Sequence, residues 1–427
     1  MQGTSTFKKW LKIIALGYTG GIMYTLMYIR YTFYDQMMGA MGVTNTQLAL
    51  LTSISGIAAI IVNIPGGYFA DKFDAKKCLM ESIIAMTVCA FLFAAFCDNY
   101  AVCKVIWFIM PISIMAYWPS LIKYINSMGG EGNEGASFGN YYLINGLSGA
   151  LGNVVALAIY NKSGSLSAGM YGLAVMYLIA VVVCFFALDD EKKLAERGIY
   201  LKGDEPIKVK YIWPVIKWPG FWILSLFIMC DYALYSNLSY FAPYLTNVMG
   251  IPENTSSALA IVRQYGIAFI APLGGILADK VFKSTAKAFM VNMVITAALI
   301  AIVFFFSPDS NPVLVAIYSI VPSFVVYLVY SIQYSIIRHL HFSPVVVGTA
   351  IGIGGLAGNL GNVIFPAYFG SLLDKFGNDG YRYVFISLIA LAGVVFLIAF
   401  WASRLDKDVL SGKKAFKLHG DEIPATE

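Results

Sequence analysis

Charged residues are scarce in this sequence. Asp, Glu, Lys and Arg make up 12% of its 427 positions, whereas 59% are hydrophobic. A soluble globular chain carries about 25% charged residues, so this chain cannot cover a water-exposed surface, and we expect much of its surface to face lipid. It has only three His and six Cys, without metal-ligand spacing, and no phosphate-binding loop. The sequence therefore predicts neither an enzyme nor an ATP-driven pump, and no cofactor, metal or catalytic residue.

Long apolar segments are what the sequence has instead. A helix that spans a bilayer needs roughly 20 predominantly apolar residues. Twelve such segments occur, at about residues 11–34, 46–70, 77–97, 101–124, 136–160, 168–188, 219–246, 255–278, 285–306, 312–337, 345–373 and 380–402. We therefore predict an all-α membrane protein with twelve transmembrane helices.

The distribution of basic residues predicts the orientation of these spans. With a cytoplasmic N-terminus, 22 of the 29 Lys and Arg residues lie in inner segments, and four lie in outer loops (Lys104, Lys162, Lys375 and Arg382). Such an excess of Lys and Arg is typical of cytoplasmic loops. An even number of spans then places both termini in the cytoplasm. The net charge of +5 follows from this topology and does not indicate nucleic-acid binding.

Two motifs occur twice in the chain at nearly the same spacing. The first follows the second apolar segment and recurs 208 positions later: Gly67, Ala70, Asp71 and Lys72 match Gly275, Ala278, Asp279 and Lys280. The second is the Gly- and Asn-rich segment 145–153, which recurs at 354–362, 209 positions later. Two unrelated motifs that share a spacing indicate duplication of a six-span unit, an architecture found among transporters.

A polar segment separates the two halves and predicts four parts of the chain. These are an N-terminal six-helix half (1–188), a cytoplasmic linker (189–218), a C-terminal six-helix half (219–403) and a cytoplasmic tail (404–427). The linker begins with Asp189, Asp190 and Glu191, and we expect its charges to be solvated.

The loop after span two resembles a known signature. Residues 67–77 are similar to the loop between spans two and three of the major facilitator superfamily, with Asp74 where that family usually has Gly. With the second copy at 275–280, the resemblance covers essentially the whole chain and implies a transporter of two pseudo-symmetric six-helix halves. It also implies a conformational latch made of Gly67, Asp71, Lys72, Lys76 and Asp279.

A narrower resemblance is to the organophosphate antiporter branch, typified by the glycerol-3-phosphate antiporter. It rests on Tyr28-Ile29-Arg30-Tyr31, Trp118-Pro119 followed by Lys123, Pro243-Tyr244-Leu245, 278–282, and Gly348-Thr349-Ala350-x-Gly352. That branch pairs an arginine in span one with another in span seven to hold phosphate. Counted from Pro243, the second arginine position is Tyr235 here. The departure disfavours phosphate-ester exchange and favours proton symport.

Arg30 is the best candidate for an anion site. Charges inside spans are costly and by default mark pathways or sites, and a guanidinium can hold a carboxylate or phosphate with two parallel hydrogen bonds. At helical spacing, Met23, Met27 and Tyr34 share its face. Tyr24, Tyr28 and Tyr31 lie on a neighbouring face. Of these, Tyr24 and Tyr28, together with Tyr235, are the predicted walls of the site. The alternative is an arginine held by a fixed structural partner.

Three more ionisable groups lie inside the spans, and each has two interpretations. Lys123 could bind substrate or extend to the membrane interface. Arg263 could pair with Asp231 or complete an anion site with Arg30. Asp231 could carry a proton, because a buried carboxyl group can stay protonated at physiological pH, or it could form a permanent salt bridge with Arg263.

Other candidates line the predicted pathway. Span ten carries a stripe that includes Tyr327, Tyr330, Tyr334 and Arg338 at helical spacing, which could be either a pathway lining or a packing seam. The glycines of spans five and eleven are predicted to be close-packing surfaces. Among them Asn359 needs hydrogen-bond partners and is a candidate substrate contact.

These observations predict a secondary active transporter that moves a small organic anion by alternating access. The expected substrate is a carboxylate or sugar acid rather than a phosphate ester, the expected coupling ion is a proton, and the protein is expected to function as a monomer in the cell (inner) membrane. Two alternatives remain: an efflux or neutral-solute carrier in which Arg30 is structural, and a transport-inactive sensor. A sensor would be expected to carry an appended signalling domain, and the segment after Arg404 is short and polar.

Overall fold

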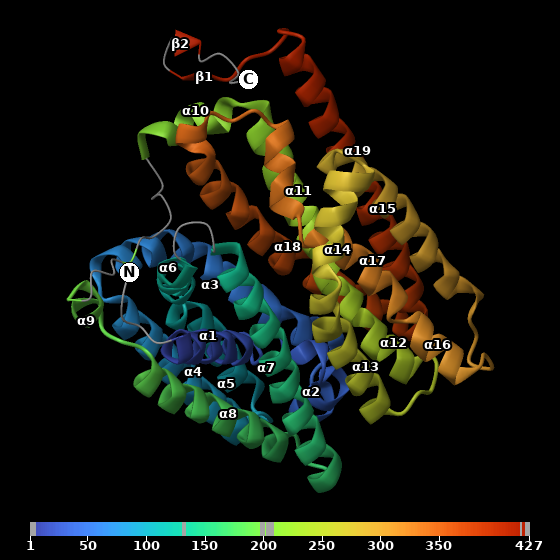
Figure 1. Cartoon of the computed structure of the whole chain (residues 1–427). Coiled ribbons are helices and arrows are strands. Elements are labelled where there is room, and N and C mark those ends of the chain that lie inside the picture. The colour runs from blue at the N-terminus through green and yellow to red at the C-terminus, as the bar shows by residue number, and fades with distance from the viewer. Residues whose placement is uncertain (1–5, 130–133, 197–200, 202–208, 419–420, 423–427) are drawn as a thin grey trace. The chain divides into compact units, whose positions relative to one another are not determined.

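The chain folds almost entirely into helices. In the computed structural model, described for residues 6–129, 134–196, 201, 209–418 and 421–422, the exceptions to helices, turns and loops are two two-residue antiparallel strands, β1 (Lys417–Leu418) and β2 (Asp421–Glu422) (Figure 1). Lys417 pairs with Glu422 and Leu418 with Asp421.

Six spans precede the linker. In chain order they are α1 (Thr6–Met23) with η1 (Ile29–Tyr31) and α2 (Tyr34–Met41); α3 (Asn45–Lys72); α4 (Ala75–Phe96); α5 (Tyr100–Ser113) with α6 (Tyr117–Gly129); α7 (Glu134–Ser163); and α8 (Leu166–Ala187). The linker contains α9 (Glu191–Ala195), η2 (Val209–Tyr211) and α10 (Ile212–Lys217).

Six spans follow the linker. They are α11 (Pro219–Asn237) with η3 (Leu238–Tyr240) and α12 (Phe241–Asn247); α13 (Glu253–Tyr265) with η4 (Gly266–Phe269), α14 (Ala271–Ile276) and the π-helical turn η5 (Leu277–Val281); α15 (Thr285–Ala301) with η6 (Ile302–Phe305); α16 (Pro312–Tyr318), α17 (Val321–Tyr330) and η7 (Gln333–His339); η8 (Pro344–Val346) with α18 (Val347–Phe376); and η9 (Gly377–Asp379) with α19 (Gly380–Leu410).

Length and hydropathy of these helices agree with the twelve predicted spans. Among the described residues, nine helical stretches are long and apolar enough to cross a membrane, and one of them, Pro344–Leu410, contains both α18 and α19. The two remaining spans are the first, of which Trp10–Met23 is a shorter apolar helix, and the eighth, which changes helix type between α13 and η5. Large apolar side chains such as Phe186 and Phe305 are exposed, as expected of surfaces that face lipid chains. The predicted fold class is confirmed.

The described chain divides into two compact units. The first contains Met1–Asp204 and Ile251–Ala268, and the second contains Glu205–Gly250 and Phe269–Glu427. Helix α13 is part of the first unit, where the Tyr265 hydroxyl accepts a hydrogen bond from Asn153 of α7 (3.0 Å). A Cβ atom at Gly149 would collide with the Tyr265 ring, so the glycine permits this close approach of α13 to α7. The four-part division at 188, 218 and 403 stays a prediction.

Several spans are interrupted, and four of the interruptions recur at equivalent places in the two halves. Spans one and four break after Met23 and Ser113, and spans seven and ten, each six spans later, break after Asn237 and Tyr330. Proline explains two of these breaks, because its ring clashes with the carbonyl of the residue four positions earlier and it has no N–H. Pro119 follows the break in span four, and Pro243 follows the break in span seven.

The interruption of span one corrects the sequence analysis, which expected one continuous helix over 11–34. Helix α1 ends at Met23, residues 24–28 form turns, and Arg30 lies in η1. Met23, Met27, Arg30 and Tyr34 therefore do not share one face of an α-helix. Locally, the Thr25 hydroxyl donates to the Gly21 carbonyl (2.8 Å), a contact known to bend helices.

Candidate functional site

The break in span one places Arg30 in a buried aromatic surround. Its side chain is 2% exposed, and the centre of its guanidinium lies 5.4 Å from the ring centroid of Tyr31 and 5.8 Å from that of Tyr34. Tyr28 stacks on Tyr31, with centroids 5.5 Å apart. Arg30 and the predicted wall residue Tyr28 are thus brought together through Tyr31. Tyr24 instead lies edge-on to Tyr117, with centroids 6.3 Å apart.

The side chain of Lys123, a residue of α6, contacts the signature loop (residues 67–77). Its ammonium donates to the Ala70 carbonyl at 2.6 Å and lies 3.1 Å from Asp71 Oδ1. Ala70 is in the last turn of α3, where backbone carbonyls lack partners within the helix and attract a cation. Lys123 therefore bridges spans two and four, a role that sequence reasoning missed because the partners lie far apart in the chain.

The second half contains a weaker copy of this contact. Arg338 of η7, at the end of span ten, lies 3.5 Å from Asp279, the repeat of Asp71, and both side chains are about two-thirds exposed. In each unit, the aspartate of the repeated loop thus meets a cation from the C-terminal end of the fourth span of its half. The exposed pair contributes little to stability, because solvent screens it.

The other predicted latch residues contact neighbouring rings and the linker. Lys72 lies over the rings of Tyr68 and Phe73, and Lys76 lies 3.6 Å from Asp190. A Cβ atom at Gly67 would meet nothing within 4 Å, whereas one at the preceding glycine, Gly66, would collide with the Met115 carbonyl. The close approach at this loop is therefore made by Gly66.

Asp74 has a defined role at the position where the resemblance expected Gly. Its carboxylate accepts from the Lys77 amide (3.1 Å), which caps the start of α4, and from the Glu191 amide (2.8 Å). Glu191 in turn accepts from the Ala75 amide (2.9 Å). Asp74 and Glu191 thus cap each other's helix N-termini, where carboxylates are favoured.

The acidic start of the linker corrects another expectation. Its charges were expected to be solvated, but Lys12 donates to Asp189 (2.8 Å), and Asp190 and Glu191 have the partners given above. The Tyr124 hydroxyl also donates to the Asp189 carbonyl. Asp189 and Asp190 form ion pairs with Lys12 and Lys76, which lie near the starts of spans one and three. These ion pairs hold the start of the linker against the first unit.

In the second unit, tyrosines of α11 and α17 stack on one another. Tyr235 stacks on Tyr330, with centroids 4.3 Å apart and planes 14° from parallel, and its centroid lies 5.5 Å from that of Tyr327. Tyr232 also stacks on Tyr330, at 6.1 Å. The sequence had indicated Tyr235 and Tyr327 as candidate substrate contacts, but not that they form a four-ring cluster with Tyr232 and Tyr330. The predicted stripe on span ten is divided, because α17 ends at Tyr330 and a 3₁₀-helix begins at Gln333.

Tyr334 follows Tyr330 by four residues, and Asn359 lies on α18. Tyr334 is 44% exposed, and its hydroxyl is 3.8 Å from where a Cβ atom would lie on Gly355 of α18. Asn359 is half-buried on the same helix. Of the span-eleven glycines, Gly361 makes a close contact, since a Cβ atom there would collide with the Met229 carbonyl, whereas a Cβ atom on Gly355 would make only an ordinary contact.

Asp231 is fully buried in the middle of α11. Its exposure is 0%, and neither carboxyl oxygen has a hydrogen-bond partner among the described residues of its own unit. Buried polar groups are nearly always hydrogen-bonded, and an exception calls for an explanation such as a transferred proton or ion. Arg263, its predicted alternative partner, is 4% exposed on α13 and belongs to the first unit.

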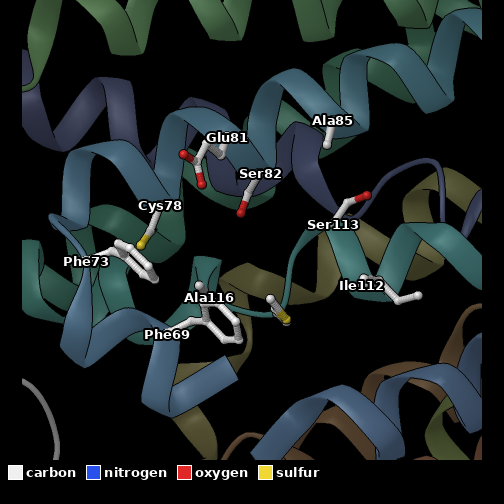
Figure 2. Close-up of a pocket in the computed structure, with 10 residues that line it drawn as sticks. Phe69, Phe73, Cys78, Glu81, Ser82, Ala85, Ile112, Ser113 and Ala116 are labelled. Atoms are coloured by element: carbon white, nitrogen blue, oxygen red, sulfur yellow. The ribbon is translucent and has the colours of Figure 1, made fainter. Parts of the chain in front are cut away.

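A cavity of about 330 Å³ lies elsewhere in the first unit (Figure 2). It is lined by Phe69, Phe73, Cys78, Glu81, Ser82, Ala85, Ile112, Ser113, Met115 and Ala116. None of the predicted substrate-binding residues lines it. The cavity borders the signature loop, and its lining is not that of the anion site that Arg30 indicates.

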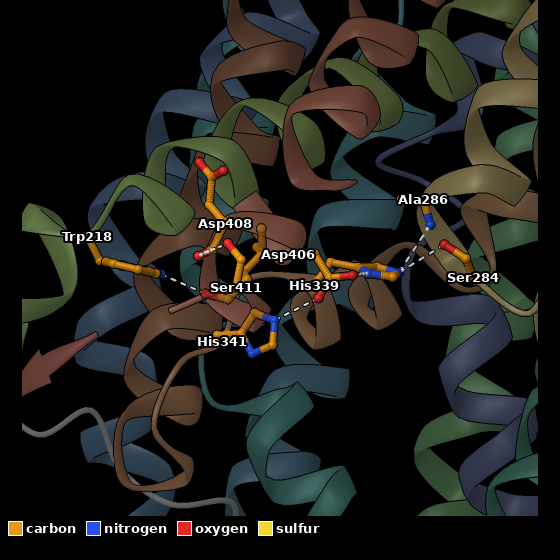
Figure 3. A network of polar contacts seen from close by, with 9 residues as sticks. Trp218, Ser284, Ala286, His339, His341, Asp406, Asp408 and Ser411 are labelled. Atoms are coloured by element: carbon orange, nitrogen blue, oxygen red, sulfur yellow. Dashed lines mark hydrogen bonds and ion pairs between the residues drawn. The ribbon is translucent and has the colours of Figure 1, made fainter. Parts of the chain in front are cut away.

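Two histidines that sequence reasoning left without a role meet one carboxylate. His339 Nδ1 lies 2.9 Å from Asp406 Oδ2 and His341 Nε2 lies 2.7 Å from Oδ1 (Figure 3). The Ala286 amide donates to His339 Nε2 (3.4 Å), which leaves Nδ1 as the nitrogen that donates to Asp406. Trp218 donates to the intervening Leu340 carbonyl (2.7 Å). These hydrogen bonds connect residues 339–341 to α19, through Asp406, and to the start of α15, through Ala286.

Comparisons with known proteins agree with this architecture. A model of the family described as Major Facilitator Superfamily matches residues 16–345 and 224–424. The chain is similar to the inner membrane protein YqcE of Escherichia coli (26% identity, 93% of this chain and 95% of that protein). It is also similar to the probable sulfoacetate transporter SauU of Cupriavidus necator (24% identity, 86% and 87%).

Solved structures give the same fold. The bacterial homolog of the human lysosomal transporter Spinster, in its inward-facing and unoccupied conformation, matches with a TM-score of 0.72 over 95% of this chain and 99% of that chain, at 15% identity. A likeness at this identity concerns the fold. With the family match across the described spans, the chain belongs to the major facilitator superfamily and is a multi-pass membrane transporter, not an enzyme.

Proposed function

We propose that this protein is a secondary active transporter for a small organic anion, with Arg30 as the group that holds the anion. The observation that carries the proposal is the position of Arg30: 2% exposed, on an interrupted span, against the rings of Tyr31 and Tyr34. A charge in a membrane span is costly, so its retention favours a functional role. A guanidinium held against aromatic rings can still present its in-plane N–H groups to a planar or tetrahedral anion.

The similarity to a probable sulfoacetate transporter supports the same substrate class. Sulfoacetate carries a carboxylate and a sulfonate, and a guanidinium can bind either group by two hydrogen bonds. Tyr235 in place of a second arginine still disfavours phosphate-ester exchange. We propose a carboxylate, sugar acid or sulfonate as substrate, with Tyr24, Tyr28, Tyr235, Tyr327, Tyr334 and Asn359 as its further contacts.

Asp231 is proposed as the proton-coupling group. It is buried, and its carboxyl oxygens lack partners within the second unit. Ionisation of such a group is disfavoured unless a partner appears, so it holds a proton in one state of the cycle and releases it in another. A permanent salt bridge to Arg263 is the alternative, and the properties of an Asp231→Asn variant separate the two.

We further propose that the protein lies in the inner membrane with both termini and the linker in the cytoplasm. The similarity to an inner membrane protein supports the location, and the 22 inner against four outer basic residues support the orientation.

Thermal stability in the presence of ligands tests the substrate class. Detergent-purified protein would be heated with carboxylates, sugar acids, sulfonates, phosphate esters and neutral sugars, because a ligand that binds only the folded state raises the melting temperature. We expect a shift with one of the first three classes in the native protein and none in Arg30→Ala. Arg404→Ala is the matched control, since Arg404 also lies over a ring, Phe400 at 5.5 Å, but is exposed. Stabilisation by neutral solutes alone would contradict the proposal.

A further inference from the structure

Helix α8 inserts a side chain into the break of span one. The Tyr177 hydroxyl accepts a hydrogen bond from the Leu26 amide (3.2 Å) and donates to the Met23 carbonyl (3.0 Å). Tyr177 is 1% exposed, so water cannot replace these contacts. A phenol has one hydrogen to donate and can accept in return, and both capacities are used here on the backbone of another span.

These two backbone groups need partners because the helix stops there. In an uninterrupted α-helix the Leu26 amide would donate to the Ile22 carbonyl, four residues back. That carbonyl instead accepts from the Thr25 amide at 3.0 Å, in the three-residue spacing of a 3₁₀ turn. A backbone polar group without a partner is costly at membrane depth. The Tyr177 hydroxyl therefore stabilises the broken form of span one against the continuous helix.

We infer that Tyr177 is a positioning residue for the anion site: it holds span one in the interrupted conformation that directs Arg30. The inference rests on the proposed role of Arg30. Arg30 lies four residues after Leu26, in the 3₁₀ segment that follows the break. Its direction is thus set by how the chain leaves the break, which the Tyr177 hydroxyl fixes.

The geometry indicates how loss of the hydroxyl would act. Without it, the Leu26 amide and the Met23 carbonyl gain partners most readily by extending α1 through the break. Each residue that changes from 3₁₀ to α geometry turns the following chain by about 20° and shortens it by about 0.5 Å. A change over a few residues is enough to rotate Arg30 away from the rings of Tyr31 and Tyr34, against which it now lies.

Tyr177→Phe removes the hydroxyl and keeps the ring. A guanidinium turned away from the anion loses its paired hydrogen bonds, so we expect affinity for the best anion from the thermal-stability screen to fall about tenfold or more. The substrate concentration at half-maximal exchange should rise by a similar factor, with the maximal exchange rate changed far less. Both quantities would be measured with purified protein in liposomes.

Tyr18→Phe is a matched control. The Tyr18 hydroxyl also joins spans one and six, since it donates to the Met176 carbonyl at 3.0 Å, but Tyr18 lies in the regular part of α1. Its loss removes a similar hydrogen bond without releasing a break, so affinity should stay within about twofold of the native protein. Replacement of Tyr177 by 4-aminophenylalanine, which keeps a donor and an acceptor, should restore most of the binding and serves if the Phe variant folds poorly.

The outcomes separate this inference from the proposed function. If Arg30→Ala loses binding while Tyr177→Phe binds as the native protein does, Arg30 keeps its role and the positioning role of Tyr177 is wrong. If Tyr177→Phe and Tyr18→Phe weaken binding equally, or if 4-aminophenylalanine fails to restore it, the hydroxyl has only a general packing role and the inference fails. If Arg30→Ala binds normally, the proposed function fails and this inference fails with it.

Discussion

Lys123 and Asp71 are joined across spans two and four, with the lysine Nζ 3.1 Å from Asp71 Oδ1 and 2.6 Å from the Ala70 carbonyl. Lys123 is 8% exposed, whereas the Asp71 side chain is 54% exposed. The ammonium is therefore held in place mainly by the helix end that it caps, and the carboxylate adds a partly screened attraction. This arrangement connects the signature loop to span four.

The first prediction concerns this contact as a latch. Asp71→Asn removes the ion pair but leaves the Ala70 contact, so we expect slower substrate exchange with affinity within a few-fold of the native protein. Asp279→Asn is the control, because its ion pair with Arg338 is longer and exposed, and its effect should be smaller. Rate and affinity would be measured separately in liposomes. Full turnover of Asp71→Asn would remove the latch role from Asp71.

The orientation of the spans gives the second prediction. Asp309→Cys lies in the loop between η6 and α16, and Ser411→Cys lies just after α19; both positions are exposed. We expect an impermeant thiol reagent added to intact cells to label the first and not the second. The six native cysteines are buried and should give little background. Labelling of Ser411→Cys from outside would contradict the proposed orientation.

The third prediction decides the role of Asp231. Asn has nearly the shape of a protonated carboxyl group but cannot release a proton. If Asp231 couples transport to protons, Asp231→Asn loses accumulation driven by a pH gradient and keeps exchange of labelled for unlabelled substrate. If Asp231 forms a salt bridge with Arg263, the same change destabilises the fold, and Arg263→Gln partly restores it. The exposed Asp309→Asn serves as the control and should alter neither property.

The fourth prediction concerns Glu253, at the start of α13. Burial raises the pKa of its carboxyl group, the nearby Asp35 raises it further, and a hydrogen bond from Tyr160 partly opposes both. The folded state then binds a proton more tightly than the unfolded state, so the contribution of Glu253 to stability falls as pH rises above the unfolded value of 4.5.

Glu253→Gln should therefore raise the melting temperature relative to the native protein at pH 7 more than at pH 4.5. The measurement is thermal unfolding across this range, with Asp309→Asn as the exposed control. A stabilisation that is the same at every pH would show that the titration of Glu253 is not the cause.

The sequence predicted the fold well because its signals are local or repeated. Apolar length revealed the spans, and the shared offset of the Asp71 and Asp279 motifs revealed the duplication. The break in span one was not predictable, because one of the groups that stabilise it, Tyr177, lies 151 positions from Leu26. The same is true of the Lys123 contact and of Asp189 with Lys12, 177 positions away. Such partners depend on which helices are neighbours, and periodicity within one helix carries no information about that.

The candidate site was predicted in part for the same reason. Arg30 stood out because a charge in an apolar segment is unusual wherever it lies. Helical spacing had placed Tyr34 on the same face as Arg30 and Tyr31 on a neighbouring face, and the guanidinium meets both rings. The break in span one, which helical spacing could not predict, instead places Tyr24 against Tyr117. In the second unit, Tyr235 and Tyr327 were found, but their stack on Tyr330 joins two spans.

Binding of the best anion to Arg30→Lys and Arg30→Ala, with Arg404→Ala as the control, tests the account most directly. Lys keeps the charge and loses the paired donors, so the loss of a charge-assisted hydrogen bond, about 1.5–3 kcal/mol, should weaken binding roughly tenfold or more. Ala should abolish specific binding while the protein still inserts in the membrane, and Arg404→Ala should bind as the native protein does. Native affinity and transport in Arg30→Ala would contradict the organic-anion account and favour a carrier of neutral solutes.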